Sequence, residues 1–140
     1  MSTNDAPQRV HRIALLSTSD TDLLSARASL AAYNLGNPAR QSIEAVLDGA
    51  EVAVLRVLGS SAEVAEELSA LRATGLPLVV LGGERTPSAE LMEQSSVPIG
   101  LAAQAHSYLA EGGPANLAQL HAFLCDTVLL DGQGFDEPVV

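Results

Sequence analysis

Three short polar segments carry the side chains that could do chemistry in this chain. The first, STSDTD, offers hydroxyl and carboxylate oxygens from Ser17, Ser19 and Asp20. Such hydroxyls could hold an oxyanion where a helix starts, but the segment lacks glycines for close backbone approach, and Asp20 and Asp22 would repel phosphate. We therefore expect helix capping there, with a ligand site as the alternative.

The two other segments also follow apolar runs. Gly59 to Ser61 comes after EVAVLRVL, and Gly82 to Arg85 comes after LPLVVL, where Glu84 could present a carboxylate to a ligand. A Gly-Gly pair after a strand is more often just a turn. If the apolar runs are parallel strands, all three segments share the edge where open α/β sheets bind ligands.

A sharp break separates two helical patterns near the end of the chain. Gly112 and Gly113 can adopt the backbone conformation that ends a helix, and Pro114 suits the first position of the next one. Asn116 falls in the first turn of this second helix, where its amide could reach a ligand or, more commonly, tether a loop. We expect the helix to be largely buried, because Leu117, Leu120, Leu124 and Val128 form an apolar stripe.

His121 and Cys125 are four residues apart on that helix, and His106 lies on the helix before it. The spacing puts an imidazole and a thiol on one face, and these groups could bind zinc or cobalt. A histidine in an apolar stripe usually bonds a backbone carbonyl, however, and a lone buried cysteine usually fills space. We therefore predict no metal site and keep these three residues as weak candidates.

The elements that must position these residues alternate along the chain. Strands are expected at 12–17, 51–58 and 76–81, with a fourth at 97–100, and helices at 20–33, 42–48, 61–74 and 87–92, while 33–38 reads as a turn. This order predicts a single three-layer α/β domain with a parallel sheet, Rossmann-like or flavodoxin-like, over residues 12–131. Residues 1–11, including His11, read as a disordered leader and residues 132–140 as a flexible tail.

Composition excludes several classes of function. The formal net charge is −10, which disfavours nucleic acid and anionic membranes as partners. A single cysteine, the lack of an apolar leader and the lack of a long apolar run predict a cytoplasmic protein. Neither G-x-x-x-x-G-K-[ST] nor G-x-G-x-x-G nor G-x-S-x-G occurs, so neither a phosphate-binding loop nor a hydrolase elbow is predicted.

A resemblance to a known family rests on the run AAQAHSYLAEGGPANLAQLHAFLCDTVLLDGQGF. It resembles a segment near the amino terminus of the large, CobN-type subunit of aerobic cobaltochelatase, a relative of the magnesium chelatase large subunit. The segments LLSTSDTDLLSARAS, YNLGNPAR and LGGERTPSAELMEQSSVPIG resemble the same family in the same order. The resemblance covers about residues 12 to 136 and implies the first domain of a much longer subunit.

The resemblance also implies an activity and partners. The complete enzyme is expected to insert Co(II) into a corrin precursor, hydrogenobyrinic acid a,c-diamide, with ATP hydrolysed by two smaller ATPase-type subunits. The partners implied are the remainder of the large subunit, those two subunits and the corrin substrate. We expect this segment to bind no cofactor of its own and to have no chelatase turnover alone. The alternatives are a non-catalytic assembly or corrinoid-binding module and, less favoured, a free-standing flavodoxin-type enzyme.

Overall fold

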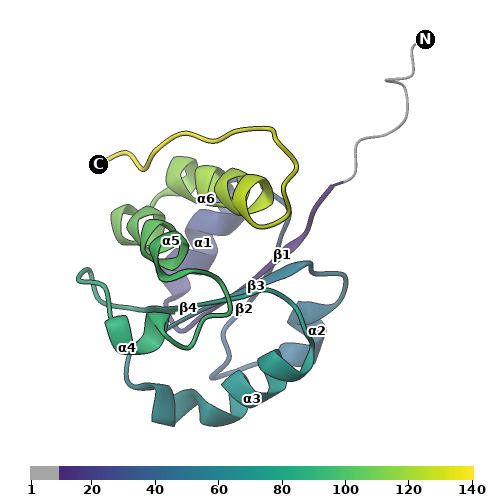
Figure 1. The fold of residues 1–140 in the computed structure, drawn as a ribbon, viewed down its shortest axis with the longest axis vertical. Coiled ribbons are helices and arrows are strands. Elements are labelled where there is room, and N and C mark those ends of the chain that lie inside the picture. Colours follow the sequence, from purple (N-terminus) through teal and green to yellow (C-terminus); the bar gives the residue numbers. More distant parts are fainter. Residues whose placement is uncertain (1–9) are drawn as a thin grey trace.

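A four-stranded parallel sheet forms the middle of the molecule in the computed structural model, which describes residues 10–140. The strands lie in the order β2-β1-β3-β4 (Figure 1). Their bounds are β1 (Ile13–Ser17), β2 (Tyr33–Gly36), β3 (Val52–Val57) and β4 (Leu78–Gly82). Because the chain leaves β1 toward β2 and then returns to β3 on its other side, the order of the strands reverses between β1 and β3, as in flavodoxin-like folds.

Helices cover both faces of this sheet (Figure 1). On one face lie α1 (Asp20–Ala28), α5 (Ile99–Glu111) and α6 (Pro114–Thr127). The opposite face carries α2 (Ile43–Leu47) and α3 (Ala65–Ala73), which follows a 3-10 turn, η2 (Ser61–Val64), while the short α4 (Ala89–Met92) lies beside β4. The predicted three-layer α/β domain of the Rossmann-like or flavodoxin-like class is confirmed.

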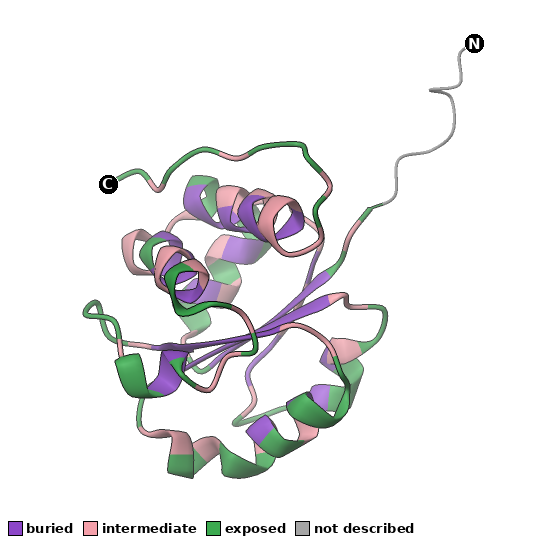
Figure 2. Ribbon diagram, in the orientation of Figure 1, coloured by how far each residue is buried: buried purple, intermediate pink, exposed green. Residues whose placement is uncertain are grey.

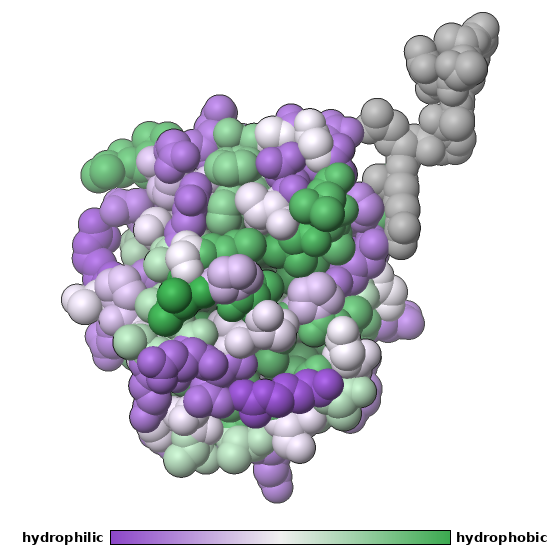
Figure 3. Space-filling model, viewed as in Figure 1, coloured by the Kyte–Doolittle hydropathy of each residue, from purple (hydrophilic) through white to green (hydrophobic). Residues whose placement is uncertain are grey.

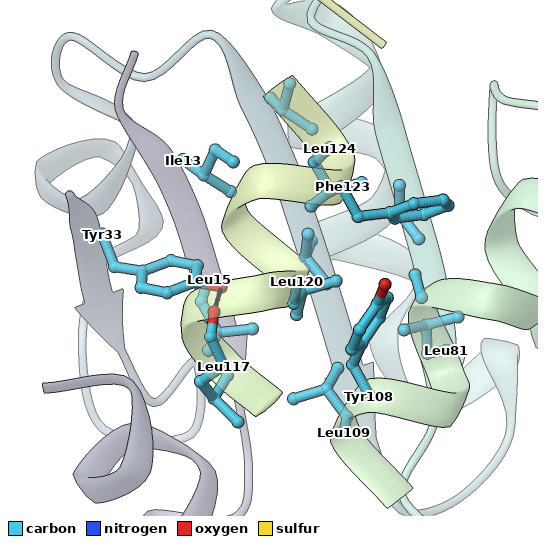
Figure 4. Close-up of a cluster of buried hydrophobic side chains, with 14 of the residues drawn as sticks. Ile13, Leu15, Tyr33, Leu81, Tyr108, Leu109, Leu117, Leu120, Phe123 and Leu124 are labelled. Carbon is cyan, nitrogen blue, oxygen red and sulfur yellow. Dashed lines mark hydrogen bonds between the residues drawn. The ribbon is translucent and has the colours of Figure 1, made fainter. Parts of the chain in front are cut away.

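Alternation along each strand builds two hydrophobic cores, because successive side chains of a strand point to opposite faces. Ile13 and Leu15 pack with the residues of α1, α5 and α6, whereas Ala14 and Leu16 pack with those of α2 and α3. β1, β3 and β4 are buried along their length, while the middle of β2 is half-buried (Figure 2). Figure 4 shows the core beneath α5 and α6. Fully burying each leucine contributes about 1.5–3 kcal/mol, so these cores provide the main stabilisation of the domain.

The sequence prediction for residues 29–38 is wrong. It placed a turn at 33–38 and extended the preceding helix to residue 33, whereas the structure has a second strand, β2, there. The helix ends at Ala28, and Tyr33–Gly36 pairs with β1 from Ile13 onward. Tyr33 is buried and its hydroxyl donates to the Leu117 carbonyl at 2.6 Å (Figure 4). Pairing with β1 and burial of the tyrosine therefore outweigh the turn propensity of Asn34 and Gly36.

The strand expected at 97–100 is also wrong, because these residues lead into a helix. Pro98 is the residue before α5, and Ile99 and Gly100 form its first turn. The outer edge of β4, where another strand would pair, is covered by two serines instead. Ser96 Oγ accepts from Leu78 N at 2.7 Å, and Ser95 Oγ accepts from Val80 N at 2.8 Å.

Residues after α6 run back across the α5 and α6 helices without forming a helix or strand (Figure 1). Phe135 packs against the core, and its ring contacts that of Phe123 edge-on, with 5.0 Å between the ring centroids. Tyr108 is buried, and its hydroxyl donates to the Asp136 carbonyl. On the face drawn in Figure 3, hydrophobic and polar residues are interspersed over α5 and α6. The predicted flexibility of 132–140 stays a prediction.

The predicted leader lies mostly outside the described residues, but His11 is placed. Its Nδ1 lies 2.9 Å from Glu51 Oε2, and its carbonyl accepts from His121 Nε2 at 3.0 Å. This residue therefore belongs to the entry of β1 instead of to a leader. Among residues 10–140, no helix is long and apolar enough to cross a membrane.

Candidate functional site

Arg56 is the charged residue at the centre of the predicted ligand edge. It lies next to the end of β3, on the central part of the sheet, and only 6% of its surface is exposed. Asp22, in the first turn of α1, is also 6% exposed and accepts from Arg56 Nη1 with both carboxylate oxygens at 2.9 Å. The two residues form a buried ion pair where the strand order reverses.

Backbone carbonyls accept further hydrogen bonds from all three nitrogens of this guanidinium. Nε donates to the Gly82 carbonyl at 3.0 Å, Nη2 to the Gly83 carbonyl at 3.3 Å and Nη1 to the Leu109 carbonyl at 3.4 Å. Arg56 thus joins β3, α1, the end of β4 and the last turns of α5. With these partners, the arginine keeps one N–H, on Nη2, for a further acceptor.

Ser17, Ser19 and Asp20 lie at this edge as the sequence predicted. Ser17 is fully buried, donates to Asp22 Oδ2 at 2.8 Å and accepts from Ser19 N at 3.0 Å. Ser19 is the N-cap of α1 and accepts from Asp22 N at 3.4 Å, while the exposed Asp20 pairs with Arg40. The two serines support the ion pair and the helix start, which is the capping role that the sequence favoured.

Glu84 lies in the loop after β4, with its side chain exposed to solvent. Its backbone carbonyl accepts from His106 Nε2 at 2.8 Å, which ties the loop to α5. His106 is buried, and burial, together with the charge of Arg56, lowers its pKa, whereas the bond to Glu84 opposes this shift. His106 therefore acts as a neutral donor that holds the loop at neutral pH.

Gly112 and Gly113 form the break between α5 and α6, at the same edge of the sheet. Their backbone angles are φ 72°, ψ −175° and φ 89°, ψ 157°. Both pairs fall in a region of positive φ and extended ψ that is essentially restricted to glycine. The sequence predicted the sharp turn correctly, and the backbone conformation explains why two glycines are needed.

Asn116 follows this break and tethers the tail. Its Nδ2 donates to the Gly112 carbonyl at 2.8 Å and to the Val139 carbonyl at 2.7 Å, and its Oδ1 accepts from Val139 N at 2.8 Å. The side chain is buried with these three bonds made. This is the loop-tethering role that the sequence analysis favoured over ligand binding.

Two pockets adjoin this edge, one of about 310 Å³ lined by Asp20, Leu23, Leu24 and Arg27, and a smaller one beside η2. The smaller pocket, of about 230 Å³, is lined by apolar residues and by Thr18, Glu63 and Glu67. Between residues 10 and 140, no buried side-chain nitrogen or oxygen lacks a hydrogen-bond partner. The buried polar side-chain groups of this edge are therefore paired within the described part of the chain.

The three candidate metal ligands are split between the two ends of the sheet. His106 bonds the loop after β4, whereas His121 Nε2 donates to the carbonyls of His11 and Ala32, which precede β1 and β2. Cys125 Sγ lies 3.6 Å from His121 Nδ1. In the described part of the chain, no three His, Cys, Asp or Glu residues are placed to hold a metal ion.

His121 and Cys125 form a neutral pair. Because His121 Nε2 donates to two carbonyls, the proton lies on that nitrogen and Nδ1 accepts from the thiol. Burial lowers the pKa of His121, although its carbonyl partners oppose that shift, and burial with the nearby Asp131 and Glu51 raises the pKa of Cys125 to about 11. The thiol therefore stays protonated at neutral pH and is a poor nucleophile or metal ligand.

Sequence reasoning missed Arg56 and treated Asp22 as an obstacle to phosphate. A usable signal was present, because the arginine interrupts an otherwise apolar strand run just before its end. A charge in a buried strand needs a partner, and the acidic loop after the neighbouring strand could supply one. Which acidic residue pairs with Arg56 depends on the order of the strands in the sheet, because Asp22 lies 34 positions away in the sequence.

These features define a flavodoxin-like α/β domain whose carboxyl edge is closed by a buried ion pair. Its fold and sequence are similar to those of a solved structure, the catalytic subunit of cobaltochelatase from Mycobacterium tuberculosis, with 46% identity and a TM-score of 0.91. The alignment covers 94% of this chain but 12% of that one. No protein-family model and no curated protein matches the chain.

Proposed function

We propose that this chain is a domain of a cobaltochelatase catalytic subunit of the CobN type. The supporting observation is the similarity over 94% of the chain, with 46% sequence identity and a TM-score of 0.91. The complete enzyme would insert Co(II) into hydrogenobyrinic acid a,c-diamide in the cytoplasm. Cobalt and the corrin precursor are its substrates, and ATP would be hydrolysed by two smaller partner subunits.

Within such an enzyme, we assign this domain a structural and assembly role. Metal insertion needs a cavity for a macrocycle, ligands that replace the water around the cation and a base for the pyrrole protons. The pockets of about 230 and 310 Å³ that adjoin the carboxyl edge are small for a macrocycle, and Arg56 is bonded to Asp22 and the Gly82 carbonyl. These properties favour an assembly role over corrinoid binding.

Segment exchange tests this proposal. The matching segment of the M. tuberculosis subunit is replaced by this chain, and the chimera is assayed with both smaller subunits, ATP, Co(II) and the corrin precursor. We expect a folded chimera that assembles and inserts cobalt within about tenfold of the parent rate, because a shared fold with closed internal contacts should be interchangeable.

Two control chimeras separate folding from function. One carries Asp22→Asn, which breaks the buried ion pair, and the other carries Arg40→Gln, which removes an exposed one. The first should lose folded protein and the second should match the unmodified chimera. An unmodified chimera that folds but neither assembles nor inserts cobalt would overturn the proposed function.

A further inference from the structure

Another pocket lies at the opposite, amino end of the sheet and is larger than the two at the carboxyl edge. Its volume is about 440 Å³, within the range of small-molecule sites. It lies between the α3–β4 connection and the α4–α5 connection, which run side by side (Figure 1). Its lining combines apolar residues, Leu76, Pro77, Leu78 and Val97, with polar ones, Arg72, Gln94, Ser95 and Ser96.

Arg72 is the charged residue of this lining. Its Nη2 donates to Gln94 Oε1 at 2.6 Å and to the Gln94 carbonyl at 3.3 Å, which are both neutral acceptors. Within residues 10–140, it makes no ion pair with a carboxylate, although the chain carries a net charge of −10. Its neighbours three and four positions away along the sequence are uncharged. The positive charge of Arg72 is therefore uncompensated by direct contacts.

The two serines add further donors. Ser95 Oγ and Ser96 Oγ accept from backbone N–H groups of β4 at 2.8 and 2.7 Å. Their own hydroxyl protons point to the carbonyls of Val80 and Leu78 at 3.4 and 3.5 Å, which is longer than an ordinary O–H···O bond. These hydroxyls can therefore turn toward a better acceptor placed in the pocket.

Charge distinguishes this pocket from three others on the described chain. Those are lined by carboxylates, among them Glu44, Glu63 and Asp20, whereas no acidic residue lines this one. An arginine and two hydroxyls beside an apolar wall fit an anion attached to an apolar group. A planar carboxylate matches the fork of a guanidinium.

We propose that this pocket binds a small carboxylate with an apolar body. Arg72 donates to the carboxylate, the hydroxyls of Ser95 and Ser96 support it, and Leu76, Pro77 and Val97 contact the apolar body. The site lies away from the ion pair at the carboxyl edge and is independent of the proposed chelatase role, so either proposal can fail without the other.

Binding can be measured by titrating the full chain with hydrocinnamate while recording two-dimensional amide NMR spectra. Hydrocinnamamide is the matched ligand, because it has the same body without the charge. We expect saturable shifts at the amides of Gly75, Leu76, Leu78 and residues 94–97. The affinity should be at least about tenfold higher for the acid than for the amide.

Arg72→Gln should remove the preference for the acid, and Arg72→Lys should retain part of it. Arg27→Gln is the matched control, because Arg27 and Arg72 both lie one residue before the end of a nine-residue helix. The spectra also report whether each variant is folded. The proposal would be overturned by equal affinity for acid and amide, or by shifts only at residues outside the pocket. It would also be overturned by unchanged binding to a folded Arg72→Gln variant, or by no saturation below about 20 mM.

Discussion

Arg56 and Asp22, 34 residues apart in the sequence, form a buried ion pair with both carboxylate oxygens 2.9 Å from one guanidinium nitrogen. The pair lies where the sheet reverses its strand order, the position at which related folds bind their ligands. Here Ser17 donates a hydrogen bond to Asp22, and three backbone carbonyls accept further hydrogen bonds from Arg56. At this edge, the hydrogen bonds of Arg56, Asp22 and Ser17 therefore connect β1, β3, β4, α1 and α5.

Removing one charge of this pair should destabilise the domain strongly. Asp22→Asn leaves the buried guanidinium without a counter-charge, and we expect the free energy of unfolding to fall by about 3–5 kcal/mol. Arg40→Gln, which breaks the exposed pair with Asp20, should change it by less than about 1 kcal/mol. Urea unfolding of the three proteins measures both effects. Similar losses for the two variants would show that the ion pair is not what holds this edge together.

The two glycines at the α5–α6 break should not tolerate a side chain. Gly112→Ala forces alanine into φ 72°, ψ −175° and should cost about 1–3 kcal/mol. Gly100→Ala is the matched control, because Gly100 is inside α5 and no atom lies within 4 Å of the position that an alanine methyl would occupy there. That change should be neutral or stabilise by up to about 1 kcal/mol. Thermal unfolding of the wild type and the two variants measures these changes. Equal melting temperatures for Gly112→Ala and the wild type would argue against a backbone requirement for glycine at position 112.

Asn116 should control the mobility of the tail. Asn116→Ala removes all three side-chain bonds that connect Gly112 and Val139, and we expect a loss of about 1–3 kcal/mol. Hydrogen exchange at the Val139 amide should become faster, whereas exchange at the Val54 amide in the central strand should report the global loss alone. An unchanged rate at Val139 would mean that the tail is already free in solution, as the sequence suggested.

Stability should fall on mild acidification because of the His121 imidazole. Burial lowers the pKa of His121 in the folded chain below the usual 6.5. The unfolded chain then takes up the proton first as the pH falls, so the contribution is complete above about pH 6.5 and is lost as the pH drops from there toward the lowered folded pKa.

The measurement compares urea unfolding at about pH 7.5 and about pH 5.5 for the wild type and for His121→Gln. The wild type should lose more stability over this interval than the variant, because the variant lacks one half-buried titrating imidazole. His106 remains in both proteins, and its own lowered pKa therefore cancels in the comparison. An identical loss in the two proteins would contradict the assignment of His121 as a neutral, half-buried donor.

Local patterns predicted much of the fold. Apolar runs located β1, β3 and β4, and helical stripes with Gly112, Gly113 and Pro114 located α5 and α6. The sequence did not predict β2. Its four residues include an asparagine and a glycine, which have turn propensity, and the strand forms only through its tertiary pairing with β1. For the same reason the Arg56–Asp22 pair could not be derived from spacing, since it depends on which strands are neighbours.

The sequence predicted where the candidate site residues lie, but it did not predict which groups they bond. Ser17, Ser19, Glu84 and Asn116 do lie around the carboxyl edge, but their hydrogen bonds in the structure are with the chain's own backbone and side chains. Whether they also bind a ligand stays a prediction. Hydrogen-bond saturation is a three-dimensional property, and a sequence shows donors and acceptors without showing which of them are already paired.

Titration with hydrogenobyrinic acid a,c-diamide shows whether the chain's own hydrogen bonds close the carboxyl edge to a ligand. Macrocycle absorbance is followed as the purified chain is added, with Glu84→Gln and the exposed Glu93→Gln as matched variants. The closed edge predicts no saturable change up to about 100 μM for any of the three proteins. Saturable binding that Glu84→Gln weakens and Glu93→Gln leaves intact would contradict it, and would make this edge a corrin site.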